Sequence, residues 1–166
     1  MNQSPIDISK PVAYNNFDII FTFNVLKLIK YTKYDQNHVS FKANFGIFIY
    51  QNQEYQMKEI EIYTPGMHKI NGIRFPYELH IKSFGIDGSV VTIITVFDII
   101  ENGENSFLKS LGFGDEKIKK AVENQKYIDD KDINITLSDL IGIKLHFIIY
   151  MGQSFTPPCG SSLYIY

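Results

Sequence analysis

The chain has no tryptophan, a single cysteine and no concentrated run of positive charge. Cys159 has no second cysteine with which to form an internal disulfide, which fits either a reducing compartment or an unused thiol. The formal net charge is -2, so the composition gives no reason to expect nucleic acid or an acidic membrane surface as a partner. No apolar run approaches the ~18 residues that a transmembrane helix requires. These absences leave an ordinary globular protein.

The length of 166 residues allows one domain with a substantial core and is short for two ordinary domains. We therefore expect residues 1–166 to form a single domain, either whole or as a piece of a longer chain. Gln3, Ser4 and Pro5 follow Met1 almost at once, without the basic and then apolar order of a signal peptide. An intracellular or organellar location is expected if Met1 is the natural start, and an extracellular one if the chain is a trimmed fragment.

Strand-like runs dominate the sequence, and its aromatic residues are Tyr and Phe among β-branched neighbours. The predicted strands cover residues 18–23, 38–49, 57–63, 77–83, 89–100 and 144–151. One helix is predicted over 115–125, where Asp115 can cap the first turn and Ile118, Ala121 and Val122 share a face. A shorter helical turn is predicted over 106–111. The pattern predicts a mainly β domain with short peripheral helices.

Two of the predicted strands carry polar residues at alternate positions. The Asn71-Gly72 pair between them is a strong hairpin signal, so the two strands are expected to be neighbours. One shared face would then carry Glu59, Glu61, Tyr63, Glu78, His80 and Lys82. Two interpretations remain open on this spacing: a solvated face of a half-exposed sheet, or a functional site.

Three landmarks occur in a fixed order: Gln3-Ser4-Pro5-Ile6-Asp7-Ile8, then Glu78-Leu79-His80-Ile81, and finally the segment from Tyr150 to Cys159, YMGQSFTPPC. In this order they resemble the α-type carbonic anhydrases, zinc enzymes that hydrate carbon dioxide. The resemblance implies a twisted, mostly antiparallel central sheet with short peripheral helices, in which the C-terminal part of the family's fold is missing.

The same resemblance implies that the family's metal position has been lost. Its three zinc-binding histidines correspond here to Glu61, Tyr63 and His80, so His80 alone is retained. Glu78 keeps the position of the glutamate that orients a ligand histidine, and His68 keeps that of a framework histidine. A catalytic zinc ion needs three protein ligands and an open fourth position, and neutral tyrosine is a poor ligand. We therefore expect no metal and no other cofactor.

Two further substitutions by the same resemblance argue against catalysis. The threonine that accepts the proton of zinc-bound hydroxide is replaced by Phe155, although Thr156 remains beside it. Lys82 stands where the family has a small aliphatic residue of the carbon dioxide pocket. His38 falls near the family's proton-shuttle histidine, but we interpret it as an exposed histidine at a strand edge.

Charges in such a cavity are expected to pair, because isolated buried charges are costly. We predict that Lys82 pairs with Glu61 or Glu59 in place of the metal's positive charge, and that Glu61 accepts a hydrogen bond from His80. The alternative is a rebuilt metal site formed by Glu59, Glu61 and His80.

The resulting functional prediction is a catalytically inactive carbonic anhydrase-like domain that serves as a structural or protein-binding subunit of a larger assembly. Acidic sugars fit less well as ligands, because no basic cluster is present. The apolar residues 163–166 predict an unpaired C-terminal strand edge along which a partner would bind. The competing class is an enzyme, either a zinc-dependent carbonate dehydratase with a rebuilt site or a related lyase or hydrolase.

Overall fold

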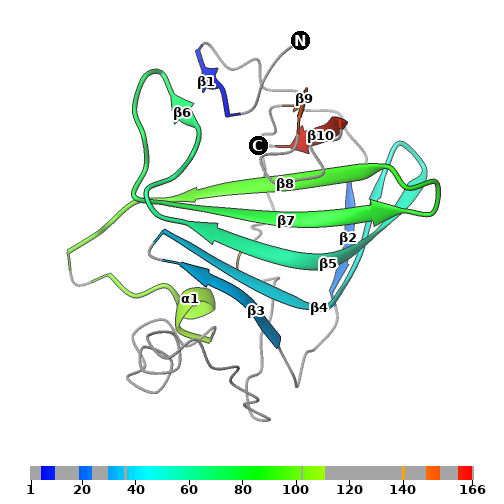
Figure 1. Cartoon of the computed structure of the whole chain (residues 1–166), viewed down its shortest axis with the longest axis horizontal. Coiled ribbons are helices and arrows are strands. Elements are labelled where there is room, and N and C mark those ends of the chain that lie inside the picture. The colour runs from blue at the N-terminus through cyan, green and yellow to red at the C-terminus, as the bar shows by residue number, and fades with distance from the viewer. Residues whose placement is uncertain are drawn as a thin grey trace.

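The structure is a computed structural model that describes residues 5–9, 19–23, 30–35, 37–101, 103–110, 140, 149–153 and 161–165. Its largest feature is a curved sheet, whose long strands lie side by side in Figure 1. The strands are β1 (Asp7–Ile8), β2 (Ile20–Phe23), β3 (Lys30–Asp35), β4 (His38–Tyr50), β5 (Gln53–Tyr63), β6 (Lys69–Ile70), β7 (Tyr77–Gly85), β8 (Val90–Phe97), β9 (Ile149–Gln153) and β10 (Ser161–Ile165), and the described helix is α1 (Ser106–Ser110). The predicted mainly β fold is confirmed.

The main sheet has the order β2-β4-β5-β7-β8-β10-β9, and β3 also pairs with β4. Its pairs are antiparallel except for β10, which runs parallel to β8. The predicted pairing of the two polar strands is confirmed, since β5 lies antiparallel to β7. A separate short parallel pair joins β1 to β6 near the N-terminus (Figure 1).

The Asn71-Gly72 turn has the backbone conformation that the sequence predicts. Asn71 and Gly72 have φ angles of 51° and 78°, which a two-residue turn of this kind requires. Ile70 and Ile73 form a bridge across the turn, and the Gly72 amide donates to Asp7 Oδ1 at 3.0 Å. The turn thus ties the N-terminal strand to the segment between β5 and β7.

The hydrophobic core is formed by the sheet strands together with α1. Its fully buried side chains include Phe41, Phe45 and Phe48 from β4, Met57 and Ile60 from β5, Leu79 and Ile81 from β7, Ile165 from β10 and Phe107 from α1. Because most of these side chains alternate with polar residues along their strands, one face of the sheet packs on the core and the other carries the polar set.

The end of the chain departs from the prediction of an unpaired strand edge. The strand β10 pairs with β8 on one side and with β9 on the other, and Tyr164 and Ile165 are buried. The apolar residues of β10 are therefore used inside the sheet, and the prediction that this strand has an unpaired edge was wrong; Tyr166 lies outside the described residues. The helical turn predicted over 106–111 is confirmed by α1, whereas the helix predicted over 115–125 lies outside the described residues.

Within the part of the chain that the structure describes, no helix combines the length and apolar character needed to cross a bilayer.

Candidate functional site

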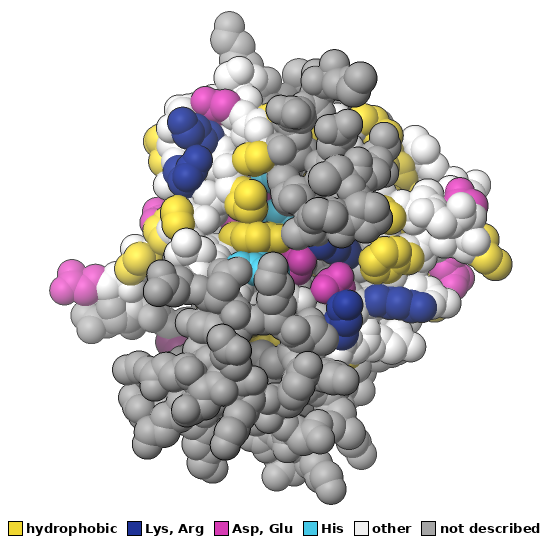
Figure 2. Space-filling view, viewed as in Figure 1, with side chains coloured by type: hydrophobic (Ala, Val, Ile, Leu, Met, Phe, Trp, Pro, Cys, Tyr) yellow, Lys and Arg dark blue, Asp and Glu magenta, His cyan; other side chains and the backbone are white. Residues whose placement is uncertain are grey.

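The register of β5 and β7 brings the predicted site residues together in opposed pairs. Glu61 faces His80, Tyr63 faces Glu78, and Glu59 faces Lys82 across the two strands. Histidine, acidic and basic side chains gather near the middle of this face in Figure 2.

The face is not the solvated surface that the alternating pattern allows. Glu61, Glu78 and His80 are 3%, 0% and 0% exposed. Burial at this level makes an unpaired charge costly, so the partners of each group decide what the site can do.

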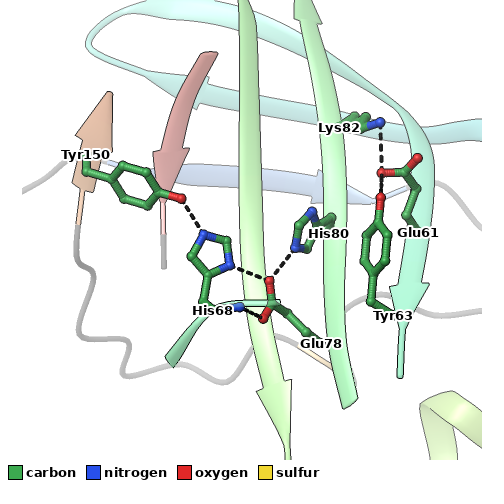
Figure 3. A network of polar contacts seen from close by, with 7 residues as sticks. All are labelled: Glu61, Tyr63, His68, Glu78, His80, Lys82 and Tyr150. Carbon is green, nitrogen blue, oxygen red and sulfur yellow. Dashed lines mark hydrogen bonds and ion pairs between the residues drawn. The ribbon is translucent and has the colours of Figure 1, made fainter. Parts of the chain in front are cut away.

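Lys82 and Glu61 form the central ion pair of the site. The Lys82 Nζ atom lies 2.8 Å from Glu61 Oε2, and the Tyr63 hydroxyl donates to the same oxygen at 2.9 Å (Figure 3). Lys82 was predicted to pair with Glu61 or Glu59, and Glu61 is the carboxylate that it contacts. Glu61 accepts hydrogen bonds from Tyr63 and Lys82, whereas His80, which was predicted to donate to it, directs its Nε2 atom to Glu78.

The charge state of this group follows from its neighbours. Burial alone would raise the pKa of Glu61, but the His38 ring, the Lys82 ammonium and the Tyr63 hydroxyl outweigh it and lower the pKa to about 2. Burial and the adjacent Glu61 carboxylate raise the pKa of Tyr63. Tyr63 therefore remains a neutral phenol beside an ionised carboxylate.

His38 belongs to this group and is not the exposed histidine that we expected. It is 7% exposed, its ring stacks on Tyr63 with centroids 4.5 Å apart, and its Nε2 atom lies 3.5 Å from Glu61 Oε1. The burial of His38 follows from strand pairing. His38 is the first residue of β4 and pairs with Tyr63 of β5, and Val39 pairs with Ile62, so β5 lies against this end of β4.

A second network lies next to the ion pair and is centred on Glu78. Glu78 Oε1 is 2.5 Å from both His68 Nδ1 and His80 Nε2, and Glu78 Oε2 accepts from the His68 amide at 2.8 Å. On the far side of His68, its Nε2 atom contacts the Tyr150 hydroxyl (Figure 3). Tyr150 in turn stacks on Tyr164 of β10. The chain Tyr150–His68–Glu78–His80 thus links the loop after β5 to both β7 and β9.

The two imidazoles hold Glu78 in its ionised form. Burial raises the pKa of Glu78, but hydrogen bonds from His68 and His80 lower it by more, so the pKa is well below its usual range. Burial lowers the pKa of His80 against the opposing influence of Glu78.

The family resemblance implies positions for Glu78 and His68 but no role for Tyr150. That residue is 82 positions from His68 in sequence, and only its place at the start of the YMGQSFTPPC segment drew attention to it.

Other predicted residues lie apart from these contacts. Glu59 accepts from Ser40 Oγ at 3.0 Å and lies 3.8 Å from Lys42 Nζ, so it does not join Glu61 and His80 as a third ligand. Phe155 and Thr156 lie outside the described residues.

The donor atoms do not fit a zinc ion. At the position that the sequence resemblance assigns to the metal, Glu61 pairs with the Lys82 ammonium, and Tyr63 is a phenol that donates to Glu61. Among the described residues, the one group of three potential ligands is His68, Glu78 and His80, which is not the trio Glu59, Glu61 and His80. Its nitrogen and oxygen atoms are 2.5 Å apart, whereas two ligands on one tetrahedral zinc ion lie about 3.3 Å apart, given bonds of about 2.0–2.1 Å. The spacing is that of hydrogen bonds.

Acid is expected to destabilise the chain through Glu61. The folded pKa of about 2 lies below the ordinary value of 4.5, so the stabilisation is present above pH 4.5 and is lost as the pH falls through about 2. Between these values the group should contribute a slope of about 1.4 kcal/mol per pH unit to the free energy of unfolding. Urea unfolding between pH 2.5 and 5 should show this slope reduced in Glu61→Gln and unchanged in Glu101→Gln, at an exposed position. Parallel pH profiles for wild type and Glu61→Gln would contradict the assignment.

Comparison with solved structures reproduces the fold over almost the whole chain. A crystal structure of dioscorin complexed with ascorbate superposes with a TM-score of 0.82 at 21% identity and covers 99% of this chain and 68% of that one. The α-carbonic anhydrase of the fungus Aspergillus oryzae gives a TM-score of 0.81 at 16% identity, over 99% and 70% of the two chains. At these identities the likeness shows the fold.

No family model matches the chain. Curated relatives nevertheless agree with the structures. Alpha carbonic anhydrase 2 of Arabidopsis thaliana is 31% identical over 121 residues, which are 71% of this chain and 46% of the relative. The chain belongs to the α-carbonic anhydrase family. Carbonic anhydrase Nec1 of Nesocodon mauritianus is 27% identical over 95% of this chain and 56% of the relative, and Dioscorin DB3S of Dioscorea polystachya is 29% identical over 75% and 44%. The chain spans about half the length of these curated relatives.

Proposed function

We propose that residues 1–166 form a single carbonic anhydrase-like domain that has lost catalysis and serves as a structural or protein-binding subunit of a larger assembly. The observation that carries this proposal is the ion pair between Lys82 and Glu61, 2.8 Å long, at residues that the sequence resemblance assigns to the metal and its surrounding pocket. The ammonium supplies the positive charge that a metal would otherwise supply to this buried carboxylate.

The neighbouring groups support the loss of the metal. A phenol with a raised pKa does not become the phenolate that would bind a cation, because ionising it beside Glu61 would bury two like charges together. The buried ring of His80 donates a hydrogen bond to Glu78. Across the strands His80 faces Glu61, whose carboxylate is already paired with Lys82. Neither strand presents a set of free, convergent ligands.

A second candidate function is a zinc-dependent carbonate dehydratase, or a related lyase or hydrolase, with a rebuilt site. Two observations favour it: several relatives are carbonic anhydrases, and His68, Glu78 and His80 place three potential ligand atoms within 4.8 Å of one another. Metal binding there would require the two hydrogen bonds to Glu78 to open and the three side chains to separate.

The binding role rests on the surface of the main sheet. Since β10 is an interior strand, the outer strand on that side of the described sheet is β9, and its Met151 is 58% exposed. An outer strand offers unpaired backbone groups to another chain, and an exposed methionine adapts to varied apolar contacts. We therefore place the proposed protein partner along the edge of β9 and not along the C-terminal residues.

The test combines metal content with catalysis. The purified protein, incubated with zinc and then dialysed, is expected to carry well under one zinc ion per chain and to hydrate carbon dioxide at the uncatalysed rate. An active α-carbonic anhydrase is the positive control. The variant Glu61→His/Tyr63→His, which returns imidazoles to two ligand positions, is expected to retain more zinc than wild type. Stoichiometric zinc in wild type with hydration above background would overturn the proposal in favour of the enzyme.

A further inference from the structure

A groove lies on the same face of the sheet as the candidate site, farther along the strands. Phe84 follows Lys82 by two positions on β7, so both side chains point to the same face, and Phe84 pairs with Gln56 of β5. The groove has a volume of about 670 Å³, within the range of small-molecule sites. It lies where the β4–β5 and β7–β8 hairpins end (Figure 1), and its lining residues are Asn52, Gln53, Glu54, Gln56, Lys58, Phe84, Gly85 and Ile86.

The lining combines apolar surface with several polar side chains and carries no net charge. Its one acidic residue, Glu54, is matched by one basic residue, Lys58. Asn52, Gln53 and Gln56 add three amide groups, each of which both donates and accepts hydrogen bonds. This balance suits a ligand whose polar groups are themselves donors and acceptors, and it offers no electrostatic advantage to a charged one.

An aromatic ring borders these amides. Phe84 is 36% exposed, and Ile86 next to it on the turn is fully exposed. The face of a phenyl ring is electron-rich and packs well against C–H groups. A flat aromatic surface beside hydrogen-bonding amides presents the two kinds of contact that a sugar ring requires: apolar C–H groups on its face and hydroxyls at its edge.

The hairpins hold the groove in shape before any ligand binds. Asn52 has a φ angle of 61°, as a tight two-residue turn demands. The Gln53 Nε2 atom donates to Ser89 Oγ at 3.3 Å, and Ser89 donates its own amide to Asp87 Oδ1 at 3.0 Å. The two hairpin ends are therefore connected through side chains, which reduces the ordering that a ligand would otherwise have to impose.

We propose that this groove binds a neutral saccharide, with Phe84 packed against a sugar ring and the amides of Gln56, Asn52 and Gln53 bonded to its hydroxyls. The site is separate from the Lys82–Glu61 pair and does not depend on whether the domain has lost catalysis. An open groove of this kind should bind a disaccharide with a dissociation constant on the order of 1 mM, because much of the sugar remains in water.

The experiment is an amide NMR titration of the whole chain with neutral disaccharides of glucose, mannose, galactose and xylose. At least one is expected to cause saturable shifts at Asn52 to Lys58 and at Phe84 to Ile86. Phe84→Ala and Gln56→Ala should each weaken binding about tenfold or more, the loss of roughly one good contact. Ile73→Ala, at an apolar side chain that is 63% exposed and outside the groove, is the matched control and should leave binding unchanged.

A charged uronic-acid disaccharide and an uncharged tripeptide complete the panel. Shifts in the groove with the tripeptide alone would identify a protein segment as the occupant and overturn the proposal. Preference for the uronic acid, or neutral-sugar shifts that survive both groove variants, would overturn it equally. Each variant is at an exposed position, and a dispersed spectrum confirms its fold before titration.

Discussion

Replacing Lys82 by methionine is expected to lower the free energy of unfolding by about 3–5 kcal/mol at pH 7. The Lys82 and Glu61 side chains are 13% and 4% exposed, and the substitution removes the ammonium while keeping most of the volume. The carboxylate of Glu61 would then remain buried without a full positive countercharge. Its remaining contacts would be the Tyr63 hydroxyl and the His38 ring, whose Nε2 atom lies 3.5 Å away. Urea denaturation with a linear extrapolation measures the difference.

Two further variants separate the ion pair from side-chain packing. Lys58→Met removes an exposed lysine from the neighbouring strand and should change stability by no more than about 0.5 kcal/mol. Lys82→Met combined with Glu61→Gln removes both charges and should recover a large part of the loss, since a neutral pair avoids the buried charge. If Lys82→Met alone costs less than about 1 kcal/mol, the ammonium is not the countercharge that the buried carboxylate requires.

Replacing Glu78 by alanine is expected to be at least as damaging. The substitution removes the acceptor of three hydrogen bonds, from the His68 amide, His68 Nδ1 and His80 Nε2, in a place with no exposed surface. Each buried donor left without a partner costs about 1–3 kcal/mol, and the missing side chain leaves a void. The expected loss of about 4 kcal/mol or more is a large part of the stability of a typical domain.

Glu78→Gln makes the prediction measurable even if the alanine variant does not fold. Glutamine keeps the shape of the Glu78 side chain and one acceptor oxygen. Its amide NH₂ group, however, would face one of the three groups that donate to Glu78. Its cost should therefore be smaller, about 1–3 kcal/mol. Glu101→Ala, at an exposed position, should have no measurable effect. Equal stability of wild type and Glu78→Gln in urea would mean that the hydrogen-bonded network does not hold the loop after β5 against the sheet.

The local structure of β5, β7 and the segment between them was predictable from the sequence. Alternating polar and apolar residues define both strands, and the Asn71-Gly72 pair defines the turn. That Lys82 pairs with a carboxylate of β5 was also predictable, because opposite charges on neighbouring strands pair once they leave water; the sequence left both Glu59 and Glu61 open as its partner.

The burial of that polar face was not predictable from the same pattern. A strand with alternating polar and apolar residues has the same sequence pattern whether its polar side faces water or a second layer of protein. His38 is an example: the residues next to it in the sequence do not indicate that its ring stacks on Tyr63. The helix predicted over residues 115–125 and the roles given to Phe155 and Thr156 remain predictions.

Local sequence determined the strands, the turn and the charges of this protein, because these depend on residues near one another in the chain. Tertiary structure alone decided that β10 is inserted between β8 and β9, and that Tyr150 reaches His68 across 82 positions. It also decided that Lys82 pairs with Glu61 and not with Glu59, which lies opposite it on β5. Contacts between residues so far apart in the sequence depend on the strand order and register of the sheet, which are selected by the long-range packing of the whole core.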